Sequence, residues 1–73
     1  MESTKLSRAF GEMVQRRREN AGLSQEGLAD ACGLHRTHIS LLERGLREPK
    51  LSTLKALAAG LDISIATLVK ELD

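Results

Sequence analysis

The sequence predicts an all-α fold, a compact bundle of five short helices. Apolar residues recur at helical spacing along the whole chain, and no stretch shows the sustained alternation with period two that marks a strand. β-branched and aromatic residues are also too sparse for a sheet, and Phe10 is the one aromatic side chain. At 73 residues, with no linker or repeat, the chain is expected to form a single domain over residues 1–73.

The first two helices are expected on either side of Gly22. The first covers residues 5–21, because Gly22 suits the left-handed position that follows a helix. Its inward stripe has apolar residues at three- and four-residue spacing: Leu6, Phe10, Met13 and Val14. The second helix follows Ser24, whose hydroxyl can cap free backbone N–H groups, and it stops at Gly33. Its inward residues are Leu28, Ala29 and Cys32.

Three further helices complete the bundle. The third fits residues 36–44, with Ile39 and Leu42 inward. Residues 45–50 form a loop, because Gly45 and Pro49 interrupt helical structure. Helices capped by Ser52 and Ser64 follow and together span about residues 52–72. The apolar positions of these two helices are Leu54, Leu57, Ala58 and Leu61, then Ile65, Leu68, Val69 and Leu72.

Composition disfavours several classes of protein. No apolar run approaches the roughly 20 residues that cross a bilayer, and the polar start of the chain lacks a signal-peptide core. We therefore expect a cytoplasmic protein without a membrane partner, and the single cysteine, Cys32, suits a reducing compartment. No nucleophile, base or cofactor motif is present, so we expect neither enzyme activity nor a cofactor. Cys32, His35 and His38 have a suggestive spacing, but they straddle a turn and lack a fourth ligand, so no metal is expected.

The second and third helices are joined by only about three residues, Gly33-Leu34-His35. So tight a corner makes the helices cross at roughly 90–120° instead of running antiparallel, which is the helix-turn-helix geometry. We place this motif at residues 24–45. Within it, Ala29 is small enough to let the helices approach, and Gly33 suits a positive φ, which costs little only for glycine.

Residues 23–45, LSQEGLADACGLHRTHISLLERG, resemble the helix-turn-helix of the lambda/434 repressor and Cro proteins, the XRE family. The resemblance covers about residues 8–72 and includes LSTLKALAAGLDIS, which is typical of the family's fourth helix. HRTHISLLERG is most similar to the short controller proteins of restriction–modification systems. The resemblance implies a lambda repressor-like DNA-binding domain, a double-stranded DNA partner and a role in transcriptional regulation.

In this family the third helix enters the major groove with its N-terminal end toward the bases. The resemblance therefore implies four base-reading positions: Arg36, Thr37, His38 and Leu41. Arg36 is the sharpest of them, because its planar guanidinium can donate two hydrogen bonds to O6 and N7 of guanine. His38 can donate to a base or to a phosphate, and simple exposure is an equal alternative. Leu41 departs from the polar residue often found there and offers only apolar contact, for instance to a thymine methyl.

A second group of side chains suits the phosphate backbone. Gln25 opens the second helix, where free N–H groups and the helix dipole favour a phosphate. The family uses this glutamine for such a contact. Basic residues follow the third helix on the other side. The expected phosphate-contacting residues are Ser24, Gln25, Ser40, Arg44, Arg47 and Lys50.

Arg18 and Glu43 have a structural interpretation. By resemblance they match a buried Arg–Glu ion pair that joins the first and third helices in some family members. Glu43 follows Leu42 near the end of its helix, within reach of the first helix, so its position is compatible with this pairing. We expect the pair to support the fold and not to read DNA.

A single domain of this size contacts too few base pairs to select one site in a genome. A two-fold dimer on half-sites about 34 Å apart restores specificity. The apolar surplus of the last two helices can supply the interface, with internal packing as the alternative. The candidate interface residues are Leu61, Ile63, Ile65 and Leu72.

Three functions compete. The first is a sequence-specific regulator that binds a palindromic operator as a homodimer, with RNA polymerase as a further candidate partner. The second is a DNA-binding antitoxin or prophage repressor component whose main partner is another protein. The third is an interaction module that does not bind DNA, which Gln25, Arg36 and Thr37 together disfavour. We favour the first.

Overall fold

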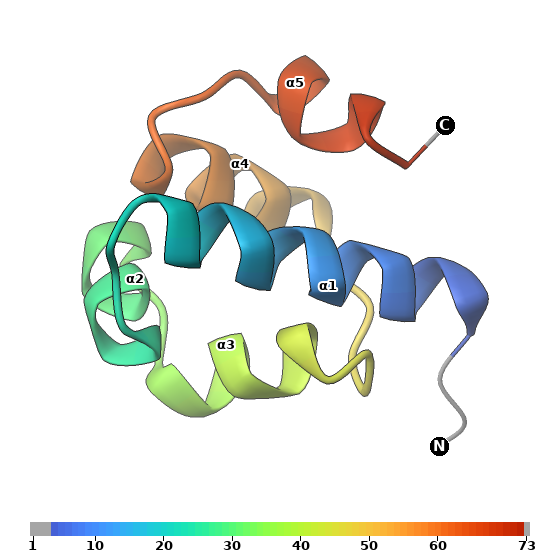
Figure 1. Cartoon of the computed structure of the whole chain (residues 1–73), viewed down its shortest axis with the longest axis horizontal. Coiled ribbons are helices and arrows are strands. Elements are labelled where there is room, and N and C mark those ends of the chain that lie inside the picture. Colours follow the sequence, from blue (N-terminus) through green and yellow to red (C-terminus); the bar gives the residue numbers. More distant parts are fainter. Residues whose placement is uncertain (1–3, 73) are drawn as a thin grey trace.

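The computed structural model describes residues 4–72, over which it contains five helices and no strand. The helices are α1 (Lys5–Asn20), α2 (Gln25–Cys32), α3 (Arg36–Glu43), α4 (Leu51–Gly60) and α5 (Ile65–Lys70). α1 lies across the middle of the molecule, with α3 on one side and α4 and α5 on the other (Figure 1). The predicted all-α bundle is therefore confirmed. None of the helices over this range is long and apolar enough to cross a membrane.

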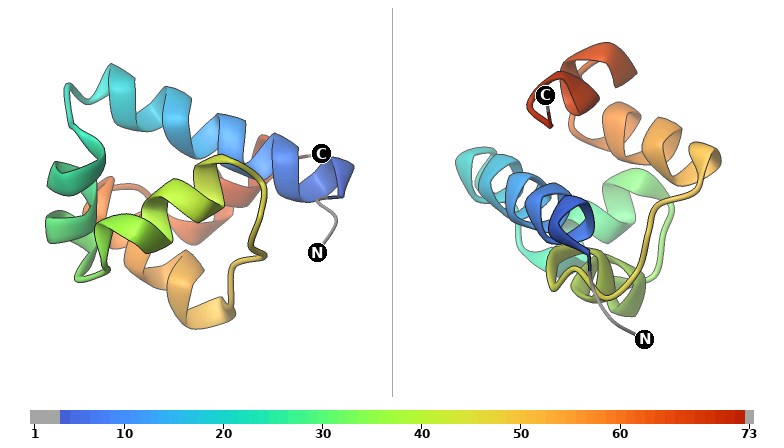
Figure 2. Two further views of the ribbon diagram at one scale, coloured as in Figure 1. Left: turned by 90° about the horizontal axis from the view of Figure 1, so that it is seen from below. Right: turned by 90° about the vertical axis from the view of Figure 1, so that its right-hand side faces the viewer.

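Each helix contributes to one hydrophobic core. α1 packs on α3, α2 packs on both α3 and α4, and α5 covers α4. Two views at right angles show that the helices cross around this core instead of lying parallel (Figure 2). The buried apolar residues are Phe10, Met13, Val14, Leu28, Ala29, Ile39, Leu42, Leu57, Ala58 and Leu68. Cys32, predicted to point inward, is half-buried at the margin of this core.

The turn between α2 and α3 follows the predicted geometry. The Ser24 hydroxyl accepts a hydrogen bond from the Gly27 N–H at 2.9 Å and so caps α2. α2 ends at Cys32, and Gly33 follows it as the C-cap with a φ of +69°, in the left-handed region that favours glycine. Three residues then lead to Arg36, the first residue of α3. The tight turn holds α2 and α3 against each other as a helix-turn-helix.

The predicted start of the fourth helix is wrong. α4 begins at Leu51, with Lys50 in the extended cap position and no side-chain hydrogen bond to the cap, so Ser52 lies inside the first turn. Thr53 and Leu57 are buried, which indicates that core packing sets where α4 begins and outweighs the capping preference of serine. Ser64, by contrast, caps α5 as predicted, accepting a hydrogen bond from the Thr67 N–H at 3.0 Å.

The predicted apolar stripe of the first helix is wrong at Leu6, which is 61% exposed. The first turn of α1 extends past the ends of the other helices (Figure 1), so little of the bundle lies beside it. Leu6 lines an open groove of about 270 Å³ together with Leu54 and Leu72. The fifth helix also ends earlier than predicted, so that Leu72 lies beyond α5.

α1 and α3 come into close contact at Gly11. A Cβ atom at this position would collide with the Leu42 carbonyl oxygen and lie 2.6 Å from the Glu43 carbonyl oxygen. Both neighbours are backbone atoms, so they cannot turn aside as a side chain can. The absence of a side chain at Gly11 therefore sets the separation of α1 and α3, and with it the position of the predicted recognition helix.

Replacing Gly11 tests this contact. Gly11→Ala should lower the free energy of unfolding by about 3 kcal/mol, the upper part of the usual range for overpacking, because α3 must shift. Gly27→Ala is the matched control, since Gly27 is also helical and its nearest neighbour is the Ser24 hydroxyl at 3.2 Å. The control should change the free energy of unfolding by no more than about 1 kcal/mol, because helix propensity favours alanine while the Ser24 hydroxyl must give way by a few tenths of an ångström. Urea unfolding followed by circular dichroism measures both, and equal effects would contradict the close contact.

Candidate nucleic-acid interface

The first residues of α3 are exposed, whereas its last turn is buried against the rest of the bundle. Ile39, Leu42 and Glu43 are buried, whereas Arg36 and Thr37 at the start of the helix are exposed. The helix lies at the edge of the bundle, on the opposite side of α1 from α4 and α5 (Figure 1). Leu41 is half-buried, and so is Ser40. The structure therefore leaves the start of α3 accessible to a large partner while its end is fixed.

His35 sets the start of α3. Its backbone is extended, and its Nδ1 accepts a hydrogen bond from the Thr37 N–H at 3.1 Å. Because an accepting nitrogen carries no proton, the proton of the neutral ring lies on Nε2. We predicted only a turn position for His35, since Ser, Thr, Asp and Asn are the usual capping residues.

Over residues 4–72, no group of three His, Cys, Asp or Glu side chains is placed to hold a metal ion.

Arg18 and Glu43 form the ion pair expected from the sequence. Arg18 Nε lies 2.7 Å from Glu43 Oε2, and Nη2 donates to Oε1 at 3.2 Å. The side chains are only 11% and 3% exposed. The hydrogen bond to Glu43 raises the pKa of Arg18, so the guanidinium stays charged. α1 and the end of α3 are thus joined by a bidentate contact.

The same pair also reaches α2. Arg18 Nη1 donates to the Leu23 carbonyl oxygen at 2.9 Å, in the turn that precedes α2. Gln25 Nε2 donates to Glu43 Oε1 at 3.1 Å, from the first residue of α2. This bond was not foreseen for Gln25, which we predicted only as a phosphate contact. Four hydrogen bonds therefore connect α1, the start of α2 and the end of α3.

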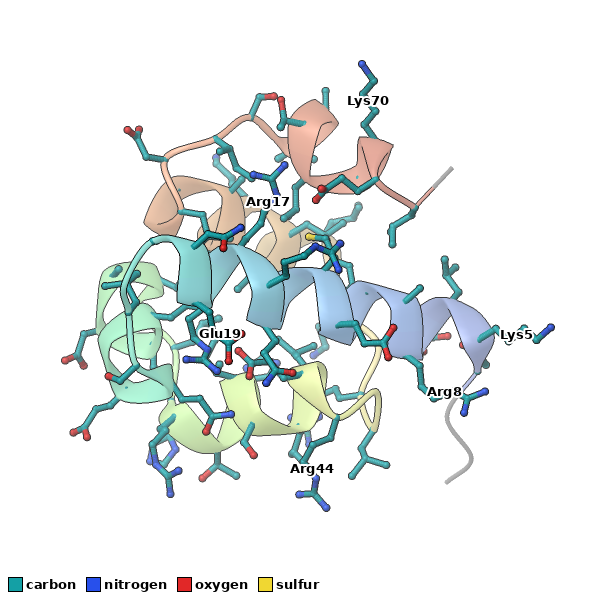
Figure 3. The ribbon with its side chains drawn as sticks, in the orientation of Figure 1. Lys5, Arg8, Arg17, Glu19, Arg44 and Lys70 are labelled. Carbon is teal, nitrogen blue, oxygen red and sulfur yellow. The ribbon has the colours of Figure 1, made fainter. Side chains whose placement is uncertain are left out.

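The predicted phosphate-contacting cations lie around the end of α3. Arg44, Arg47 and Lys50 are exposed, as is Ser24 at the start of α2. Arg44 projects from the end of α3 away from the bundle, whereas Lys70 projects from the opposite side of the molecule (Figure 3). The structure thus brings basic residues to the side of the molecule that carries α3.

Arg8 is a cation that sequence reasoning missed. It points from α1 toward the side of α3 (Figure 3), and the backbone of Gly45 packs against it. Arg8 and Gly45 lie far apart in the sequence, and no local pattern connects them. Only the packing of α1 beside the 45–50 loop shows that Arg8 adds charge to this side.

A pocket of about 420 Å³ lies where the 45–50 loop meets α1, α3 and α4. Of the four predicted base-reading residues, only His38 lines it. Burial lowers the pKa of His38, and the nearby charges of Arg47 and Lys50 lower it further. The other polar side chains in the lining are Thr4, Ser7, Glu48 and Thr53.

The predicted dimer residues differ in exposure. Ile65 is 43% exposed, whereas Leu61, Ile63 and Leu72 are half-buried and pack against the core. Internal packing therefore uses part of the surface that we assigned to a dimer interface.

The segment that follows α5 also contacts α1 through an ion pair, because Arg17 Nε lies 2.8 Å from Glu71 Oε2.

Comparison with known proteins identifies the family. Residues 14–68, more than half of the chain, match the helix-turn-helix family. The chain belongs to this helix-turn-helix family. Control protein C.SmaI of Serratia marcescens is 42% identical over 64 residues, which cover 88% of this chain and 76% of that protein. Control protein C.BamHI of Bacillus amyloliquefaciens is 40% identical over 55 residues, covering 74% and 68% of the two chains.

Comparison with solved structures also finds a restriction-modification controller protein similar to this chain. The restriction-modification controller protein C.AhdI from Aeromonas hydrophila superposes with a TM-score of 0.80 at 37% identity. That alignment covers 92% of this chain and 96% of C.AhdI. The similarity therefore extends over nearly the whole domain, including the helices that follow the helix-turn-helix.

Two of the Arg–Glu pairs of α1 reach other parts of the chain, and they provide a matched test of the buried network. Glu43→Ala should lower the free energy of unfolding by about 3–5 kcal/mol, because it leaves the largely buried Arg18 charge with only the exposed Glu19 carboxylate, 3.9 Å away. Glu71→Ala removes a pair of similar length whose side chains are 26% and 35% exposed, and it should cost less than about 1 kcal/mol. Thermal and urea unfolding measure both variants, and equal losses would contradict the assigned role of Glu43.

Proposed function

We propose that this DNA-binding transcriptional regulator binds a two-fold symmetric operator as a homodimer and acts as a restriction–modification controller protein. The observation that supports this most strongly is the division of α3 into a buried end and an exposed start. Arg36 and Thr37 are exposed at that start, and Glu43 is locked to Arg18 at the other end. A recognition helix needs this combination, because base edges are read by side chains held in a fixed orientation.

Each group of side chains has a distinct role in this proposal. Arg36 reads guanine through two hydrogen bonds, and Thr37 and Leu41 contact neighbouring base edges or thymine methyl groups. Ser24, Gln25 and Ser40 contact phosphates near the helix-turn-helix, and the cations around the end of α3 neutralise the backbone. Those cations are Arg8, Arg44, Arg47 and Lys50. His38, the fourth predicted base reader, lines the pocket beside Arg47 and Lys50.

The dimer and the cellular setting complete the proposal. We assign the dimer interface to α4, α5 and the connecting segment, with Ile65 as its most exposed apolar residue. RNA polymerase is a further proposed partner, reached through exposed side chains between Arg44 and Lys50. We assign the protein to the cytoplasm, where a regulator meets DNA and where Cys32 stays reduced. We assign it no catalytic role.

Selection of bound duplexes from a random DNA pool tests the operator and the dimer together. We expect a consensus with two-fold symmetry and half-sites about one helical turn, ~34 Å, apart, because a two-fold dimer presents two copies of α3. Sedimentation of the protein with the selected duplex should give two chains per duplex. An asymmetric single half-site would contradict the dimer, and failure to enrich any sequence would favour a protein partner as the main target.

Arg36→Ala tests base reading. It should weaken binding to the selected site by about 1–3 kcal/mol per half-site and relax the preference at one base position, while binding to random DNA is retained. Arg16→Ala is the control, because it also removes one positive charge, from an exposed side chain of α1 that belongs neither to the proposed DNA contacts nor to the proposed dimer interface. Titrations by fluorescence anisotropy on the consensus and on single-base variants measure both. Equal weakening on every sequence would show that Arg36 contacts only the backbone.

A further inference from the structure

The pocket beside α3 has an unusual charge composition. Its lining includes three basic side chains, His38, Arg47 and Lys50, and one carboxylate, Glu48. These four are the titratable groups of the lining: α3 supplies His38, and the loop supplies the others. Arg8 of α1 lies next to the pocket, against Gly45. α1 and α4 contribute hydroxyl groups, from Thr4, Ser7 and Thr53. The pocket is therefore a concave basic site lined with hydroxyl groups, of which that of Thr4 already donates to Ser7 Oγ.

Arg47 and Lys50 form no ion pair within residues 4–72, although Glu48 lines the same pocket. The ion pairs within residues 4–72 involve Arg17 and Arg18 and neither Arg47 nor Lys50. The charges of Arg47 and Lys50 instead act on His38, whose pKa they lower together with burial. Free protein at neutral pH therefore holds His38 as the uncharged imidazole, because protonation would add a third positive charge to the pocket.

We propose that this pocket receives one phosphate of the DNA backbone and that His38 takes up a proton when the phosphate enters. The inference rests on the DNA-binding function proposed above and adds a proton to the binding reaction. A phosphodiester carries one negative charge and does not titrate near neutral pH, so the proton passes from solvent to the imidazole. Protonated His38 then donates a charge-assisted hydrogen bond to the phosphate oxygen. His38 is thereby a backbone contact and not a base reader.

The direction of the pH dependence follows from the two states of His38. In free protein its pKa lies below the ordinary value, and in the complex the phosphate raises it. Binding therefore takes up a proton at any pH between the two values, and affinity rises as the pH falls through this window. Each unit of difference between the two pKa values corresponds to about tenfold tighter binding per half-site.

A pH series of DNA titrations tests the proposal. Affinity of the unaltered protein for its selected operator, at constant ionic strength, should rise as the pH falls from about 8.5 to about 5.5. His38→Gln should lose most of this gain, so that its affinity changes little between the two ends of the pH range. His35→Asn is the control for the second histidine, because asparagine keeps the cap of α3 and removes the other imidazole. This variant should keep the pH dependence.

NMR on the unaltered protein gives a direct readout of the same proton, and it tests the proposal even if the His38→Gln variant binds DNA too weakly to titrate. The pKa of His38, followed by its ring resonances, should rise on adding operator DNA, and sulfate alone should raise it by a smaller amount. Lys50→Gln should raise it in free protein. An unchanged His38 pKa in the complex, or the same pH dependence in His38→Gln, would overturn the proposal. Failure of the unaltered protein to bind DNA at every pH would instead overturn the DNA-binding function itself.

Discussion

The carboxylate of Glu43 is the point on which the arrangement of the first three helices depends. It accepts two hydrogen bonds from Arg18 and one from Gln25, and Arg18 also holds the Leu23 carbonyl. A buried ion pair is a weak source of net stability, because desolvation offsets most of its attraction. Its contribution here is positional. The pairing has one geometry that satisfies these groups, and that geometry fixes the end of α3 relative to α1 and the start of α2.

Close backbone contact at Gly11 acts together with this network. The contact sets how near α3 lies to α1, and the ion pair sets the position of α3 along and around that contact. Both constraints act near the end of α3, on Leu42 and Glu43. The start of the helix is held separately, by the turn at Gly33 and by the cap from His35. An eight-residue helix is thus held at both ends, which leaves its outward side chains for recognition.

The sequence predicted those features that depend on local chemistry. Ser24, Gly33 and Ser64 act as predicted, because capping and positive φ are properties of one residue and its near neighbours. Leu6 and Ser52 were misjudged, since burial at a helix end depends on whether another element covers it. Tertiary contact also determines the role of Arg8, which no local pattern indicates. The Arg18–Glu43 pair was foreseen only through resemblance to a family, because two residues so far apart have no shared local signal.

Gln25 connects the internal network to the DNA interface. Its amide nitrogen carries two hydrogens, and the bond to Glu43 uses one of them. The second is left for a phosphate at the start of α2, the position that the family resemblance assigns to this residue. A side chain already held by Glu43 loses less conformational freedom on binding, so its phosphate contact costs less entropy than that of a mobile residue. The buried carboxylate that positions α3 therefore also orients the side chain that we propose as a phosphate donor on α2.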